Sequence, residues 1–245
     1  MEDRPLSLIE HLEELRRRVI WCILAYTVCA TITFNFAGRI IHFLSKPAGK
    51  LIFIEPAEAF VTYIKIALWG GLFLASPFII YQAWRYVGVA LKPHERRAVI
   101  LFVPFSSVLF LAGLTFGFYV IVRIGMPFLI SFGSDVMTPM LTVSRYISFV
   151  ANMALAFGVV FQLPLAMYFL TKIGIFTPAI FSSKRRYAIA LIFIAAAVLT
   201  PGPDVFSQLL LAGPLLVLYE AGIILSKTAY RHTFRNNKTD TELIQ

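Results

Sequence analysis

The chain has 245 residues, of which 59% are hydrophobic and only 14% are charged. A soluble domain carries about a quarter charged residues, so the composition excludes an ordinary soluble domain and indicates a polytopic membrane protein. The formal net charge of +9 could suggest a nucleic-acid partner. The basic residues, however, lie in short clusters between apolar runs, as membrane orientation requires, and we expect no nucleic-acid binding.

The first 18 residues are predicted to form a cytoplasmic amphipathic helix ahead of the membrane. Ile9, Leu12, Leu15 and Val19 recur at helical spacing and make an apolar stripe. Three glutamates precede three arginines, an order that complements the helix dipole. Anchoring on lipid headgroups is expected of such a helix, but it does not explain three carboxylates beside an anionic surface.

Residues 19–226 are predicted to form one all-α polytopic membrane domain with six transmembrane helices, the last two of them short. Long apolar runs cover Val19–Gly38, Ile66–Val89, Ala98–Val122 and Tyr146–Thr171. Each of these runs can cross a hydrocarbon core of about 30 Å. The two remaining runs, Tyr187–Leu199 and the stretch from Val205 up to Glu220, reach only about 20–23 Å and are expected to cover part of the bilayer.

Lysine and arginine counts predict the orientation of the chain. Of the 22 such residues, 16 lie near the two termini, in the 85–97 region and in the 172–186 loop, and six lie in the alternating loops. Both termini are therefore predicted to be cytoplasmic. The tail, residues 227–245, is basic and then polar, and it is predicted to be disordered.

No catalytic, metal-binding or cofactor-binding motif is evident in the sequence. The four histidines make no zinc-binding helix motif, and there is neither a serine-nucleophile elbow nor a phosphate loop. Cys22 and Cys29 are interpreted as packing residues. The pair Gly113 and Gly117 is interpreted in the same way, because this spacing lets helices approach closely. We expect neither an enzyme nor a cofactor.

The carboxylates on the predicted cytoplasmic side are the candidate functional residues. Glu10, Glu14 and Glu95 could bind a cationic peptide, because a guanidinium presents a planar fork that a carboxylate accepts bidentately. Glu95 lies among basic neighbours in the loop Lys92–Arg97. The alternative is that Glu95 pairs with Arg16 or with those neighbours and only lowers the local positive charge.

Several spaced motifs, in one order along the chain, resemble the TatC family, the polytopic receptor subunit of the twin-arginine protein translocase. The resemblance runs from about Leu8 to Ser226. The motifs that carry it are His11-Leu-Glu-Glu14-Leu-Arg16, Ser76-Pro77-Phe-Ile-Ile-Tyr81-Gln82-Ala-Trp84, His94-Glu95-Arg96-Arg97, Ser148-Phe149, Ala156-Phe157-Gly158 and Pro203-Asp204-Val-Phe-Ser-Gln208. Together they are far more specific than any one of them alone.

The resemblance implies a receptor for the Ser/Thr-Arg-Arg signal peptide of folded cargo. It also implies assembly with single-span TatA-like and TatB-like partners in a multimeric complex, and transport driven by the proton-motive force without nucleotide. The membrane would be a bacterial or organellar energy-transducing one. The family's twin-arginine site corresponds here to Glu95 and Glu14, with Arg16 beside Glu14, Tyr86 on the same face, and Glu10 as a further candidate acceptor.

Other positions match the family less completely. Pro47, Asp204 and Gln208 match functionally sensitive positions, although a loop-fixing proline, a helix N-cap and a nearby amide would explain them structurally. Gln162 stands where the family usually has a glutamate, and a glutamine can only hydrogen-bond. It is interpreted either as a polar contact for a partner helix or as a packing amide. An extra glycine in Pro201-Gly202-Pro203-Asp204 leaves the start of the last span open.

Two other classes of function are compatible with the composition. The first is a small-solute secondary transporter, with Gln162, Asn152 and Glu220 around a mid-membrane cavity. The placement of most carboxylates at the predicted membrane surface argues against it. The second is a purely structural assembly factor, which would show no dependence on a signal peptide.

Overall fold

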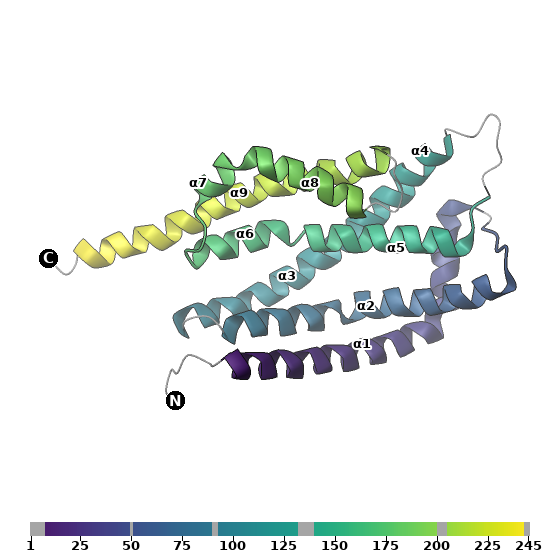
Figure 1. The fold of residues 1–245 in the computed structure, drawn as a ribbon, viewed down its shortest axis with the longest axis horizontal. Coiled ribbons are helices and arrows are strands. Elements are labelled where there is room, and N and C mark those ends of the chain that lie inside the picture. The colour runs from purple at the N-terminus through teal and green to yellow at the C-terminus, as the bar shows by residue number, and fades with distance from the viewer. Residues whose placement is uncertain (1–7, 50, 90–92, 132–139, 200–204, 243–245) are drawn as a thin grey trace. The chain divides into compact units, whose positions relative to one another are not determined.

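The computed structural model describes residues 8–49, 51–89, 93–131, 140–199 and 205–242, apart from the side chains of residues 8, 93–101, 129, 199 and 232–242. The regular elements among these residues are helices, which confirms the predicted all-α class (Figure 1). In chain order they are α1 (Leu8–Ser45), η1 (Lys46–Ala48), α2 (Pro56–Val89), α3 (Pro93–Val120), η2 (Ile121–Gly125), α4 (Met126–Ser131), α5 (Val143–Val160), α6 (Leu163–Lys172), α7 (Pro178–Ser183), α8 (Arg185–Leu199) and α9 (Val205–Glu242).

Five helical segments of the described chain are long and apolar enough to cross a membrane, judged by length and composition. They are Ile9–Ala48, Pro56–Val89, Phe102–Phe128, Val143–Lys172 and Val205–Arg231. The fifth of the predicted spans corresponds to α8, which has only 15 residues. A helix of that length rises about 22 Å, less than a hydrocarbon core of about 30 Å.

The chain divides into two compact units, Met1–Leu111 with Met126–Ala151, and Ala112–Gly125 with Asn152–Gln245. In the first unit, α1 and α2 lie side by side (Figure 1). Two adjacent glycines of α2 permit this contact. A Cβ atom added to Gly71 would lie 2.6 Å from the Cα atom of Ala30, and one added to Gly70 would lie 2.4 Å from Cγ2 of Thr33. Small residues let two helix backbones approach this closely.

The loop after α1 is tied to the segment before α5 within the first unit. Ile52 and Thr142 form an isolated parallel β-bridge. The carboxylate of Glu58 accepts hydrogen bonds from the backbone N–H of Ile54 at 2.9 Å and from that of Ser144 at 3.3 Å. One side chain at the start of α2 therefore holds both segments.

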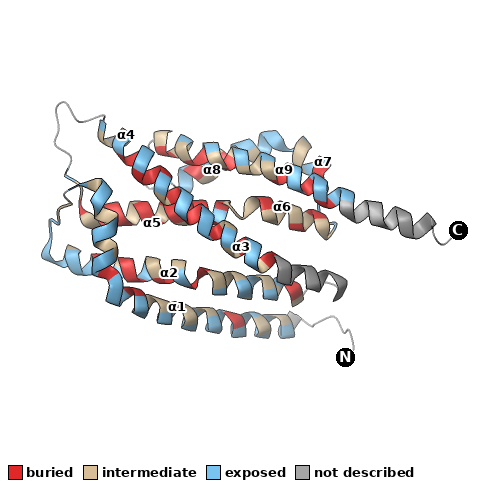
Figure 2. Ribbon diagram, turned by 180° about the vertical axis from the view of Figure 1, so that it is seen from behind, coloured by how far each residue is buried: buried red, intermediate tan, exposed pale blue. Residues whose placement is uncertain are grey.

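The hydrophobic core of the second unit forms where α3, α5, α8 and α9 meet. Its buried members are Val120, Ala156, Phe157, Val160, Ile192, Ala196, Leu211, Ala212 and Leu215, and α5 carries a run of buried residues (Figure 2). A Cβ atom on Gly113 would lie 2.7 Å from the carbonyl oxygen of Phe157, and one on Gly117 would lie 2.7 Å from its ring. The packing interpretation of this glycine pair is confirmed.

The predicted fourth span is interrupted at Phe161 and Gln162, so that α5 and α6 are separate helices. Pro164 lies in the first turn of α6 and has no N–H, so the carbonyl of Val160 lacks its helical donor. After the break, α6 packs along α9. The hydroxyl oxygens of Thr171 and Ser226 lie 2.6 Å apart in this contact, and both residues are buried.

Three other predicted segments differ in the structure. The last span, predicted to be short and to stop at Glu220, belongs to the apolar segment Val205–Arg231 of 27 residues. α1 is continuous from Leu8 to Ser45, so the N-terminal amphipathic helix and the first span are one element. α9 continues to Glu242, so the prediction of a disordered tail is wrong for residues 227–242. A helix that a packed span has already nucleated gains one hydrogen bond for each residue that it adds. The composition of the tail alone does not predict this extension of the helix.

Candidate functional site

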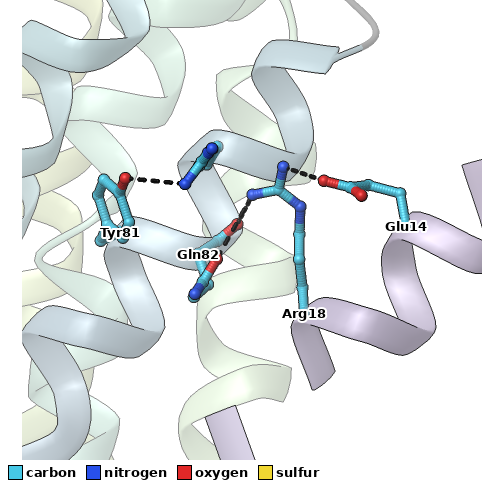
Figure 3. Close-up of polar contacts among 5 residues, drawn as sticks. Glu14, Arg18, Tyr81 and Gln82 are labelled. Atoms are coloured by element: carbon cyan, nitrogen blue, oxygen red, sulfur yellow. Dashed lines mark hydrogen bonds and ion pairs between the residues drawn. The ribbon is translucent and has the colours of Figure 1, made fainter. Parts of the chain in front are cut away.

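The N-terminal part of α1 meets the C-terminal part of α2 in a cluster of polar side chains (Figure 3). Nη2 of Arg18 donates to Oε1 of Glu14, one helical turn earlier on α1. Nη1 of Arg18 reaches α2, where the backbone oxygen of Gln82 lies at 3.3 Å and its side-chain oxygen at 3.5 Å. The side chain of Arg18 is only 9% exposed, whereas that of Glu14 is 31% exposed.

Aromatic rings adjoin this cluster on the same two helices. The rings of His11 on α1 and Tyr86 on α2 are stacked, with their centroids 4.5 Å apart. Tyr86 was predicted to lie beside the carboxylates, and within the first unit it lies one helical turn after Gln82. On α2, the guanidinium of Arg85 donates to the hydroxyl of Tyr81 at 3.2 Å (Figure 3).

Three further predicted site residues lie on α1 and α3. Glu10 and Arg16 are on α1, and both are exposed. Glu95 belongs to the first turn of α3, but its side chain lies outside the described residues. The expected pairing of Glu14 with Glu95 around one guest therefore stays a prediction.

The predicted positions elsewhere in the chain have structural partners or lie outside the description. Pro47 is the middle residue of the short helix η1 and is exposed. Nε2 of Gln208 on α9 donates to the carbonyl of Phe193 on α8 at 2.9 Å. Gln162 occupies the break before α6, and Asp204 lies outside the described residues.

Arg18 is the member of the cluster that the sequence did not single out. It was counted only among the basic residues of the cytoplasmic side. Its spacing of four residues from Glu14 was an available signal, because a glutamate four residues before an arginine pairs with it on one helix face. What the spacing could not predict is the burial of Arg18 against α2.

Chemically, the cluster offers a hydrogen-bond acceptor. The carboxylate of Glu14 has one oxygen on Arg18, and Arg18 is its only partner among the described side chains and backbone groups. The second oxygen can accept a bond from a cationic guest, because an ionised carboxylate has about four lone-pair sites. The described residues contain no group of three or more potential metal ligands.

The residues proposed for a solute cavity are placed differently. Glu220 on α9 pairs with Arg185 on α8 at 2.8 Å, and the two side chains are 50% and 49% exposed. A half-exposed ion pair does not line an internal cavity. Glu220 therefore does not belong to the cavity suggested for a solute transporter, and of the three residues suggested for that cavity only the amides of Asn152 and Gln162 remain.

Comparison with known proteins gives the family. The model of the family described as Sec-independent protein translocase protein (TatC) matches residues 10–214. The TatC protein of Carboxydothermus hydrogenoformans is 44% identical over 231 residues, which cover 93% of this chain and 95% of that protein. The TatC protein of Aquifex aeolicus is 40% identical over 234 residues, which cover 92% and 97%.

The fold agrees with solved structures of the same family. A crystal structure titled as the twin-arginine translocase receptor TatC matches with a TM-score of 0.82 and 40% identity, over 91% of this chain and 100% of that chain. A second crystal structure of a TatC receptor, in DDM, matches with a TM-score of 0.81 and 39% identity, over 89% and 99%. This chain is thus a multi-pass membrane protein that belongs to the TatC family of Sec-independent protein translocase proteins, as its motifs predicted.

Proposed function

We propose that this chain is the receptor subunit of a twin-arginine translocase and that it binds the signal peptide of folded cargo with Glu14 and Glu95. The observation that carries the proposal is the setting of Glu14. Its carboxylate is partly exposed, one oxygen is fixed by Arg18, and a stacked aromatic pair lies on the same two helices. The solved relatives are titled twin-arginine translocase receptors, which supports the same role here.

The chemistry of the site suits arginine. A guanidinium is always charged, is weakly hydrated for a cation, and stacks on aromatic faces. A guest arginine can therefore donate to the open oxygen of Glu14 and lie against Tyr86, while the second arginine of the pair meets Glu95. Lysine offers the same charge, but it is a strongly hydrated point donor that cannot stack in this way.

We place the site at the cytoplasmic face of the inner membrane, in a chain with six spans and both termini inside. The lysine and arginine distribution supports this orientation, and α8 serves as the short fifth span. Cysteine-accessibility labelling at position 240, in a variant whose two native cysteines are replaced, tests the topology. Labelling from the periplasmic side alone would refute it.

The partners we propose are TatA-like and TatB-like single-span proteins, with transport driven by the proton-motive force. The second unit supplies the support for a partner contact. Gln162 lies where α5 and α6 are interrupted, and polar side chains in membranes commonly bond across helices. Because position 162 is an amide, its contribution is a hydrogen bond and not proton transfer.

A binding experiment tests the proposal directly. The purified full chain is titrated with a fluorescent signal peptide that carries Arg-Arg, and with a matched Lys-Lys peptide. Removing one partner of a desolvated arginine–carboxylate pair costs about 2–5 kcal/mol, so Glu14→Ala and Glu95→Ala should each weaken Arg-Arg binding at least about 30-fold. Glu13→Ala, an exposed glutamate on the same helix, is the matched control.

The outcomes separate the proposal from its alternatives. Equal binding of the two peptides by wild type and by both variants would contradict a twin-arginine receptor. Photocrosslinking from position 95 to the signal peptide, with and without its arginine pair, then asks whether the two carboxylates share one guest. A transporter would instead accumulate a solute in vesicles without any partner protein.

A further inference from the structure

Arg18 is buried without being fully bonded. Its side chain is 9% exposed, and its Nε atom has no hydrogen-bond partner among the described residues. Its two contacts with Gln82, at 3.3 and 3.5 Å, are long for hydrogen bonds to a guanidinium. Among the side chains that the structure describes, Glu14 is therefore the one strong partner of this buried cation. An arginine with a purely structural role normally has more of its five donors satisfied.

The carboxylate of Glu14 is bonded through only one of its two oxygens among the described residues. Arg18 bonds one oxygen, and the carboxylate is still 31% exposed. The two residues are four positions apart on one helix, so their separation is set by α1 itself. Gln82 keeps the guanidinium against α2 (Figure 3). The pair presents to a guest a partly neutralised carboxylate with a single available oxygen.

We propose that Arg18 is a specificity-determining residue of this site: it is a resident counter-ion that offsets much of the charge of Glu14 and occupies one of its oxygens, so that charge alone holds a guest only weakly. This inference rests on the proposed function, because it assumes that Glu14 binds the signal peptide. A guest must then be held by directional hydrogen bonds and by stacking.

The electrostatics explain why this arrangement discriminates. A cation on the free oxygen of Glu14 lies roughly 4–7 Å from the guanidinium of Arg18, given bond lengths of about 2.8 Å. Because the Coulomb energy falls as the inverse of the distance, repulsion across that separation cancels roughly half of the attraction by the carboxylate, which lies about 3–4 Å from the guest. A lysine, which binds mainly through its charge, therefore loses roughly half of its attraction to the site. An arginine retains its planar hydrogen bonds and can stack on Tyr86.

The test compares Arg18→Gln with Arg17→Gln, which removes the same charge from an exposed neighbour on α1. The affinities of the Arg-Arg and Lys-Lys peptides for the purified full chain are measured at low and at physiological salt. Arg18→Gln should strengthen Lys-Lys binding about tenfold, because the carboxylate regains its net charge. Arg-Arg binding should change less, so the preference for arginine falls. Arg17→Gln and Arg18→Lys should keep the preference of the wild type.

The possible results are distinct. An equal loss of both peptides in Arg18→Gln would make Arg18 merely structural and overturn the inference, as would an unchanged preference. If Arg18→Gln is not recovered folded, Gln82→Ala replaces it. That variant releases the guanidinium from α2, and it should lower the preference in the same direction by a smaller factor. A wild type without any preference for Arg-Arg would instead refute the proposed function.

Discussion

The contact between α1 and α2 makes a sharp prediction at Gly71. This contact carries the site, because Arg18 lies on one helix and Gln82 on the other. A Cβ atom at Gly71 would lie 2.6 Å from the Cα atom of Ala30, 2.7 Å from its N and 2.8 Å from its Cβ. Ordinary contacts between carbon atoms are about 3.5–4.0 Å long. Gly71→Ala must therefore push the two helices apart by about 1 Å.

The expected cost follows from two opposing effects. Overpacking a well-filled contact costs about 1–3 kcal/mol, and here the obstacle is backbone that no rotamer change can move aside. Replacing a helical glycine by alanine returns up to about 1 kcal/mol of helix propensity. The net effect of Gly71→Ala is a loss of about 1–2 kcal/mol. For a chain of this size, that lowers the midpoint of thermal unfolding by about 2–8 °C.

Gly213 provides the control, since it also lies inside a helix and an added Cβ atom would meet nothing within 4 Å beyond its own chain neighbours. Gly213→Ala should change stability by less than about 1 kcal/mol, because the gain in helix propensity is opposed by crowding between the new Cβ atom and the ring of Pro214. Thermal unfolding of both variants in detergent, followed by tryptophan fluorescence, compares the two changes in unfolding midpoint, and the fall should be larger for Gly71→Ala. A Gly71→Ala protein that unfolds at or above the wild-type temperature would refute the close approach of α1 to α2.

Three further changes test other contacts by the same unfolding measurement. Thr171→Val should cost about 1–2 kcal/mol and Ser226→Ala less, because the hydroxyl of Thr171 keeps its bond to its own helix when Ser226 is lost; equal losses would contradict this assignment of donors. Glu220→Gln should change stability by less than about 0.5–1 kcal/mol, because its pairing with Arg185 is half exposed; a larger loss would show that the pair is shielded. Glu58→Gln should lower the unfolding midpoint, since one of two bonded oxygens becomes a donor facing a donor; an unchanged midpoint would mean that the two loops are held by other contacts.

The order of the helices could be predicted because run length and hydropathy determine it. The number of long ones could not, since the last span was predicted to be short but belongs to a long apolar segment, Val205–Arg231. The ends of the helices could not be predicted, because an apolar run ends where charged residues begin, whereas a helix can continue through charged residues that have partners. The second span was predicted from Ile66, where charges cease, but α2 begins at Pro56. Glu58 is accommodated by backbone N–H donors, and Lys65 donates to Ser144 Oγ at 2.6 Å. These are tertiary contacts, and a hydropathy window does not contain them.

The break before α6 shows the same limit for proline. Pro77, Pro104 and Pro214 lie inside continuous helices, whereas Pro164 follows an interruption. The residue type is identical in the four cases, so the outcome depends on whether neighbouring groups stabilise a kinked helix. The sequence could place a polar amide at Gln162, but it could not predict that this amide would stand at a helix end.

Within the candidate site, the sequence predicted the role of Glu14 but not that of Arg18. The reason for this difference also concerns the selectivity of the site. Orientation by positive charge counts every lysine and arginine alike. Arg17 and Arg18 each follow a glutamate by four residues, so this spacing does not tell the buried Arg18 from the exposed Arg17 either. On the proposed orientation, a cationic signal approaches the more positively charged face of the protein, where long-range electrostatics oppose it. Recognition at such a face has to come from short-range, directional bonds. A carboxylate whose charge is largely offset by a buried arginine depends mainly on those bonds. A residue that weakens the attraction of the site for every cation can therefore make the site selective for arginine.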